Sequence, residues 1–183
     1  MRLFAAIPLS LAVQERLESL QAGLPEGRAM PPENLHLTLA FFDRCDRHVA
    51  AELDAGLAAI RGEAMELWFD GLGMFGGPRP RVLYAALRPD PRLSRLRNKV
   101  VRVAQGAGID LRRERFSPHV TIARFSNGAG RGPRMQRWLE GRAGFAYGPV
   151  ATAAFSLFRS ELGASGATYT ELARYPLNGA GAD

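Results

Sequence analysis

The order strand, helix, strand occurs twice in this chain, and this repeat constrains the fold more than any other feature. The segments Leu3–Ile7 (LFAAI) and Leu83–Leu87 (LYAAL) have the same apolar profile. Each leads through one helical stretch to a strand that carries His-x-Thr, at His36 in the first copy and at His119 in the second. Self-similarity of this kind predicts an internal duplication. Because the first segment then forms a core strand, we reject the alternative that the apolar N-terminus is a weak signal peptide.

Length and residue spacing predict one domain that mixes helices and strands. The chain has 183 residues, close to the usual size of a single domain. We expect one domain over residues 1–183, with pseudo-twofold repeats at about 1–80 and 81–177. Apolar residues recur at helical spacing in four stretches, and we predict helices at about 11–24, 47–60, 92–106 and 134–141.

The two His-x-Thr strands alternate between a polar and an apolar face. Four residues share the histidine face of each strand, namely His36, Thr38, Ala40 and Phe42 in the first and His119, Thr121, Ala123 and Phe125 in the second. A buried core disfavours two imidazoles and two hydroxyls, because each buried polar group needs a hydrogen-bond partner. We therefore expect both polar faces to line one cleft, with equivalent strands of the two lobes side by side at a pseudo-twofold axis.

Two histidines and two threonines around one small ligand fit an in-line displacement at phosphorus. One imidazole takes a proton from the incoming oxygen while the other protonates the leaving oxygen, and a pKa of about 6.5 allows either role at neutral pH. The hydroxyls of Thr38 and Thr121 can donate hydrogen bonds to the non-bridging oxygens. This chemistry requires no metal, cofactor or covalent intermediate. The symmetry of the pair leaves open which histidine is the acid.

The charge balance favours an acidic partner. The chain has 24 Lys and Arg residues against 18 Asp and Glu, a net charge of +6. Such a balance is typical of proteins that bind nucleic acid. The base composition of the genome explains the bias toward Arg equally well. Basic residues beside the second motif can supply positive potential to a phosphate, although strict alternation points Arg124 away from His119. These residues are Arg112, Arg113, Arg115 and Arg124.

Other candidate motifs for phosphate chemistry lack the neighbouring residues that they need. The segment Gly71–Gly76 (GLGMFG) has the spacing of a dinucleotide-binding loop, but Gly and Pro residues follow it instead of a helix, so we interpret it as a turn. The two strand histidines have no Cys or obvious carboxylate beside them, which disfavours a metal site. Lys99, the only lysine, falls within a predicted helix and in no nucleotidyl-lysine motif.

Cysteine content and hydropathy indicate in which cellular compartment the protein is expected. Cys45 is the single cysteine, so no internal disulfide can form and a reducing, cytoplasmic setting is the expectation. The longest charge-free apolar stretch, Gly144–Phe158, is shorter than the roughly 20 residues that a membrane-spanning helix needs. We expect a monomer without membrane association.

The paired motifs resemble the two-histidine phosphoesterase superfamily, and specifically its RNA 2',3'-cyclic phosphodiesterase branch, historically called 2'-5' RNA ligase. The resemblance departs at Ala40 and at Phe42-Asp43, where the family often has a Lys and a Leu-Gly, and this concerns local substrate contacts and a turn. It covers nearly the whole chain, through the segments Arg2–Ile7, Pro32–Leu39, Phe116–Arg124, Leu157–Ser160 and Tyr169–Leu177.

The resemblance implies a bilobal, duplicated α+β fold in which two antiparallel sheets line a central cleft and helices lie on the outside. It also implies hydrolysis of a terminal 2',3'-cyclic phosphate on RNA to a 2'-phosphate, with no cofactor and no metal. Carried over residue by residue, His36 is the proton donor to the 3'-oxygen and His119 is the base that activates water. Thr38 and Thr121 hold phosphate oxygens.

Further substrate contacts are expected at Arg124, and at Phe42 and Phe125, which are placed on the cleft faces as candidates for stacking on the terminal base. Two alternatives remain open. The same site can run the reverse chemistry and join a cyclic-phosphate end to a 5'-hydroxyl, as a 2'-5' RNA ligase. The groove can also serve a non-catalytic module that binds RNA ends, although binding alone has no need of two titratable groups.

Overall fold

The computed structural model describes residues 1–111, 115–126, 128–164 and 166–178, except for the side chain of Arg44. Arg112 and Arg113 lie outside the described residues. Within that part of the chain no helix is both long and apolar enough to cross a membrane. The α-helices lie within one turn of their predicted bounds and are α1 (Leu11–Gln21), α2 (Arg47–Ala58), α3 (Pro91–Gly106) and α4 (Pro133–Glu140). The structure adds the short 3-10 helix η1 (Pro32–Asn34), which was not predicted.

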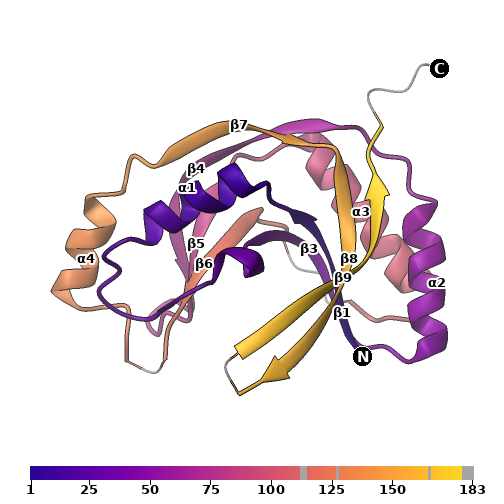
Figure 1. Cartoon of the computed structure of the whole chain (residues 1–183), viewed down its shortest axis with the longest axis horizontal. Coiled ribbons are helices and arrows are strands. Elements are labelled where there is room, and N and C mark those ends of the chain that lie inside the picture. Colours follow the sequence, from indigo (N-terminus) through magenta and orange to yellow (C-terminus); the bar gives the residue numbers. More distant parts are fainter. Residues whose placement is uncertain (112–114, 127, 165, 179–183) are drawn as a thin grey trace.

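The strands of the described residues form one large antiparallel sheet, so the molecule is an α+β protein (Figure 1). Their order across the sheet is β7-β4-β5-β6-β3-β1-β8-β9, with β2 paired to β6. The strands are β1 (Arg2–Pro8), β2 (Arg28–Ala29), β3 (His36–Arg44), β4 (Met65–Phe75), β5 (Val82–Leu87), β6 (His119–Arg124), β7 (Ala146–Thr152), β8 (Ala154–Gly163) and β9 (Gly166–Pro176).

The resemblance implies two antiparallel sheets, but hydrogen bonds join the described strands into one sheet. β3 and β6 meet in the middle of the order and join its two four-strand halves. Their pairing is limited to one position, Leu37 opposite Val120, whereas the other neighbouring strands pair over several residues. The sheet is therefore continuous but has its shortest connection at its centre, between the two His-x-Thr strands.

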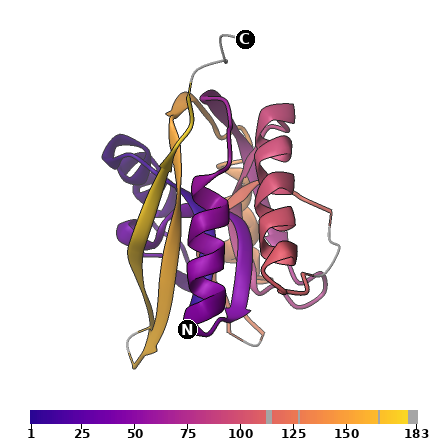
Figure 2. The same cartoon turned by 90° about the vertical axis from the view of Figure 1, so that its right-hand side faces the viewer.

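The two halves of the sheet are built from interleaved parts of the chain. β4 lies with β5, β6 and β7, whereas the C-terminal strands β8 and β9 extend the half that holds β1 and β3. The helices also cross over, because α1 contacts β6 and α3 contacts β3. α2 contacts α3, and Figure 2 shows these two helices side by side. A division near residue 80 thus describes the sequence repeat but not the strand content of each half.

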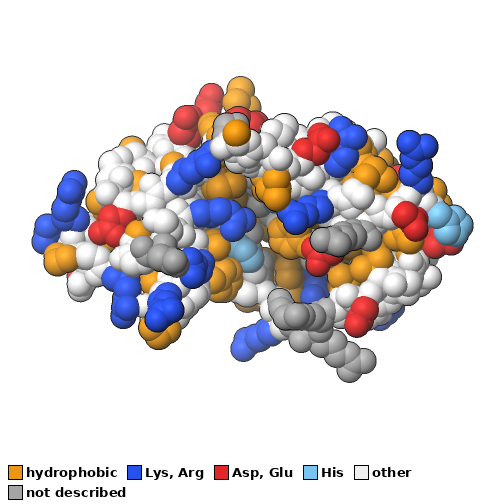
Figure 3. Space-filling view, turned by 90° about the horizontal axis from the view of Figure 1, so that it is seen from below, with side chains coloured by type: hydrophobic (Ala, Val, Ile, Leu, Met, Phe, Trp, Pro, Cys, Tyr) orange, Lys and Arg blue, Asp and Glu red, His pale blue; other side chains and the backbone are white. Residues whose placement is uncertain are grey.

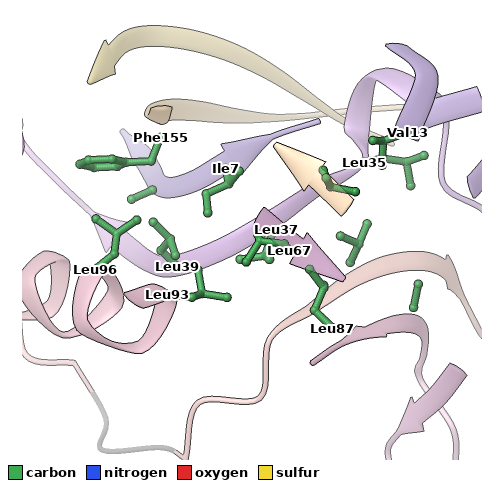
Figure 4. Packing of buried hydrophobic residues seen from close by; sticks show 14 of the residues in the cluster. Ile7, Val13, Leu35, Leu37, Leu39, Leu67, Leu87, Leu93, Leu96 and Phe155 are labelled. Carbon is green, nitrogen blue, oxygen red and sulfur yellow. The ribbon is translucent and has the colours of Figure 1, made fainter. Parts of the chain in front are cut away.

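The core lies between the sheet and the helices. Along β3 the leucines alternate with the polar residues, and Leu37 and Leu39 are buried as the period-two pattern predicts. α3 begins after Asp90, whose carboxylate accepts hydrogen bonds from the backbone N–H groups of the first turn. Leu93 and Leu96 of this helix lie against Leu39 (Figure 4). Full burial of each such leucine contributes about 1.5–3 kcal/mol, and this packing leaves the opposite face of β3 free for the site.

The Gly-rich segment 71–76 is only partly the turn that its composition indicates. β4 continues through it to Phe75, and the next element is the strand β5 rather than a helix. Gly73 lies opposite Tyr84 in this pairing, where a Cβ atom would collide with the tyrosine ring. The glycine therefore makes room for an aromatic ring that faces the site.

Candidate active site

The pairing of Leu37 with Val120 determines how the two motifs face each other. Both of these side chains are fully buried, so the residues on either side of them point to the opposite face of the sheet. An antiparallel pair has a local twofold axis at such a position, and this axis relates histidine to histidine and threonine to threonine. The two imidazoles occupy diagonal positions, which in a regular sheet lie roughly 7–8 Å apart.

One cavity of about 710 Å³ covers this face. Seen from below, the molecule is hollowed near its middle, where a histidine is visible and basic side chains surround the opening (Figure 3). The polar residues of both motifs line the cavity, namely His36, Thr38, His119 and Thr121. The chain thus brings together two pairs of polar groups that lie far apart in sequence.

His119 is held by a backbone carbonyl and by two aromatic rings. Its Nδ1 atom lies 2.7 Å from the carbonyl oxygen of Ser117, so Nδ1–H donates and the neutral ring keeps a free lone pair on Nε2. The ring centroids of Phe75 and Tyr84 lie 4.9 Å and 5.1 Å from that of the imidazole. Burial lowers the pKa of His119, and the hydrogen bond to Ser117 opposes this shift.

His36 has a matching environment on the other strand. The ring centroid of Phe4 lies 4.8 Å from the imidazole, and Tyr169 approaches edge-on at 5.2 Å. Burial lowers the pKa of His36 to about 4, and the positive charge of Arg124 and the neighbouring His119 act in the same direction. A hydrogen bond to the backbone of Asn34 opposes the shift. Both histidines are therefore neutral in the free protein at pH 7.

A register shift in β3 overturns the predicted position of Phe42. Ala6 pairs with Thr38 but Ala5 pairs with Ala40, so Leu39 is an extra residue without a partner in β1. Such a bulge reverses the alternation beyond it. Phe42 is consequently 0% exposed, and it is Phe41, 58% exposed, that lines the cavity.

The same irregularity occurs at the same place in β6. Tyr84 pairs with Thr121 and Leu83 with Ala123, which leaves Ile122 as the extra residue. Phe125 is buried in the core at 6% exposure, so its predicted cleft position is also wrong. Arg124, expected to point away from His119, lines the cavity instead.

Three aromatic residues of the site were not identified as site residues from the sequence. Tyr169 comes from β9 and Phe75 from β4, and both line the cavity. Tyr84 of β5 lies behind His119. Phe4 and Tyr84 occupy equivalent positions in the two repeats, and this equivalence could have revealed that each histidine is backed by an aromatic ring.

The sequence profile of the 2'-5' RNA ligase superfamily matches residues 8–151. The chain belongs to this superfamily. It is 33% identical to the RNA 2',3'-cyclic phosphodiesterase of Aeropyrum pernix, over 79% of this chain and 83% of that protein. It is 31% identical to the RNA 2',3'-cyclic phosphodiesterase of Escherichia coli K12, over 96% of each. The crystal structure of E. coli LigT complexed with 3'-AMP matches the fold with a TM-score of 0.79 and 30% identity, over 96% of this chain and 97% of that one.

In this member of the 2'-5' RNA ligase superfamily, the charge of the cavity is mainly positive. Arg97 of α3, Arg115 and Arg124 all contribute to the lining, together with the carboxylates of Asp43 and Asp110. Among the described residues, no group of three or more His, Cys, Asp and Glu side chains is placed to hold a metal ion. The arrangement can bind an anion and move protons on either side of it.

Proposed function

We propose that this protein hydrolyses a terminal 2',3'-cyclic phosphate on RNA and leaves a 2'-phosphate. The observation that carries the proposal is that His36 and His119, related by the local twofold at Leu37 and Val120, line one cavity with the two threonines. Relatives named RNA 2',3'-cyclic phosphodiesterase that match most of the chain support the same conclusion. The proposed partner is therefore an RNA end.

In this proposal the two halves of the sheet act as the lobes of a duplicated fold, and the cyclic phosphate lies between them. The short connection between β3 and β6 supports this reading. So does the equivalence of the two bulges, because both follow His-x-Thr directly. A phosphorus atom close to the axis is within reach of one imidazole from each strand.

The proton transfers use the free Nε2 atom of His119 and the imidazole of His36. Water attacks phosphorus opposite the 3'-oxygen, and Nε2 of His119 takes a proton from the water as the new P–O bond forms. The P–O3' bond breaks, and His36 gives a proton to the 3'-oxygen, so that the products are a 2'-phosphomonoester and a free 3'-hydroxyl. These assignments of base and acid follow the family resemblance.

His36 must carry a proton before it can act as the acid, and the negative charge of the bound substrate favours this protonation. In the free protein its pKa is about 4, partly because Arg124 repels the imidazolium. An anionic phosphodiester between Arg124 and His36 offsets that repulsion and favours the protonated ring. The negative charge that the site recognises therefore also prepares the acid.

The remaining lining residues hold the substrate. The hydroxyls of Thr38 and Thr121 donate hydrogen bonds to the non-bridging oxygens, where negative charge is held during transfer. Arg124 adds a fixed positive charge from the same face. Phe41, rather than Phe42 or Phe125, offers an exposed ring on which the terminal base can stack.

Product analysis tests this function. Adenosine 2',3'-cyclic phosphate is incubated with the protein, and the position of the phosphate in the product is determined by phosphorus NMR or by chromatography against 2'-AMP and 3'-AMP. We expect 2'-AMP only. Formation of 3'-AMP would contradict the assigned leaving oxygen, and the absence of any product would contradict the catalytic role and leave a module that binds RNA ends.

The superfamily name makes the reverse reaction a second candidate. Direction depends on whether water or a 5'-hydroxyl attacks phosphorus. An RNA with a 2',3'-cyclic end is therefore mixed with a second RNA that carries a 5'-hydroxyl, and the products are separated by length. A longer product that resists a 3'-5'-specific nuclease at the junction shows 2'-5' ligation, whereas a product of unchanged length with a 2'-phosphate shows hydrolysis.

A further inference from the structure

The two sides of the catalytic cavity differ although the motifs are related by a twofold axis. On one side β2, which precedes His36 in the chain, pairs along β6, with Arg28 opposite Arg124 and Ala29 opposite Ala123. The equivalent position on the other side is the edge of β3 beyond Leu37. In the described part of the chain no strand pairs with that edge. The cavity therefore continues along β3, where Ala40 and Phe41 line it.

The wall opposite this edge comes from α3 and from the segment that precedes His119. Arg97 and Phe116 line the cavity there. The guanidinium carbon of Arg97 lies 5.6 Å from the centroid of the Phe116 ring, which is within the range of a cation–π contact. The pair places a flat cation and an aromatic surface beside the open edge of β3.

The Nε–H group of Arg97 is buried and has no hydrogen-bond partner in the described structure. Buried donors are satisfied in most proteins, because an unpaired one costs free energy. Arginine binds phosphate through pairs of N–H groups in a fixed geometry. A guanidinium that lines the groove and has one N–H group without a partner is therefore suited to an anionic oxygen of a ligand.

We infer that the part of this groove lined by Ala40, Arg97 and Phe116 holds the nucleotide that precedes the cyclic end, and that Arg97 binds the phosphate joining it to the terminal ribose. The inference rests on the proposed function. The 5'-oxygen of the terminal ribose carries that phosphate, so the RNA chain must leave the cavity on one side. β2 occupies the side along β6, whereas on the other side no strand among the described residues pairs with that edge of β3.

Other residues of the groove match the base and the ribose of a nucleotide. Phe116 offers a face for the preceding base, and stacking on aromatic rings tolerates every base. Asp43 and Asp110 also line the cavity and can accept hydrogen bonds from ribose hydroxyls. The protein should therefore prefer an oligonucleotide end over a mononucleotide, with little dependence on the identity of the preceding base.

A substrate-length comparison tests the inference. The kcat/KM is measured for adenosine 2',3'-cyclic phosphate and for the dinucleotide ApA with a 2',3'-cyclic end, with the wild-type protein and with Arg97→Met. We expect the wild type to favour the dinucleotide and Arg97→Met to reduce the dinucleotide-to-mononucleotide ratio by about tenfold, because a hydrogen bond to a charged group is lost. The slope of log(kcat/KM) for the dinucleotide against log salt should also fall by about 0.7.

Arg102→Met is the matched control, because Arg102 is exposed on the same helix and does not line the cavity. It removes the same charge and should leave both the ratio and the salt slope at the wild-type values. An unchanged ratio in Arg97→Met, or an equal fall in Arg102→Met, would overturn the subsite while hydrolysis of the mononucleotide still supports the proposed function. If the wild type cleaves neither substrate, the function fails and the subsite fails with it.

Discussion

Phe41 and Arg124 occupy the same position in the two copies of the repeat, each the fifth residue after a cavity histidine, and both line the cavity. Each is turned toward the cavity by a one-residue register shift in its own strand. The backbone is thus symmetric where the side chains are not. β3 presents an aromatic ring to the cavity, and β6 presents a guanidinium. This difference is what the proposed substrate requires, because it has a base on one side of its phosphate.

The neighbouring residues Phe41 and Phe42 should respond to mutation in opposite ways. Phe41→Ala should raise KM about tenfold or more, because stacking contributes about 1–3 kcal/mol per base, and should leave the melting temperature nearly unchanged. Phe42→Ala should instead cost about 3–5 kcal/mol of stability, because it empties a fully buried site. Steady-state kinetics and urea unfolding of both variants check this. Equal effects of the two changes on KM would contradict the bulge geometry.

Loss of either histidine should remove the activity while the fold stays intact. His36→Ala and His119→Ala should each lower kcat/KM by about 10²–10⁴, the usual contribution of a positioned acid or base. His48→Ala is the control, because that residue is exposed, forms an ion pair with Glu52 and does not line the cavity. The assay uses a cyclic-phosphate-ended oligonucleotide with and without chelator, and we expect chelator to have no effect. Turnover by either cavity variant at the wild-type rate would refute the mechanism.

The pH profile should report the charge of Arg124. Because Arg124 lowers the pKa of His36, Arg124→Met should raise that pKa and move the high-pH limb of kcat/KM, which requires a protonated acid, toward higher pH. It should also lower kcat/KM by about tenfold through weaker phosphate binding. Arg124→Lys keeps the charge and should keep the limb near its wild-type position. A profile that is the same in all three proteins would show that Arg124 acts on binding alone.

Stability should fall in acid because the partly buried imidazole of His36 is held in its neutral form. Its pKa is about 4 in the folded protein and about 6.5 when unfolded, so between these values the unfolded chain binds more protons and unfolding becomes easier as pH falls. The contribution reaches on the order of 3 kcal/mol at pH 4. Urea unfolding at pH 7 and pH 4.5 should show a smaller loss in His36→Asn than in the wild type. The lowered pKa of His119 also reduces stability as pH falls, so His36→Asn should still lose some stability in acid.

The local patterns were enough to predict the helices and the pairing of the two motifs in one site. α3 was predictable because apolar spacing and the Asp90-Pro91 start are properties of adjacent residues. His36 and His119 were predictable because a duplicated polar motif on otherwise apolar strands has no good place in a core. The cleft positions of Phe42 and Phe125 were wrong, because period-two alternation assumes a regular strand and cannot show a bulge.

By itself, the sequence was enough to predict the candidate residues for the chemistry and their arrangement in two equivalent sets, because residue type and short-range spacing are local properties of the chain. Only the tertiary structure decided which side chains beyond those motifs face the cavity. Leu39 and Ile122 become extra residues through the register of β1 and β5 beside them, and β2 closes one side of the cavity by pairing with β6. Such choices depend on hydrogen bonds between segments far apart in sequence, and no local pattern encodes them.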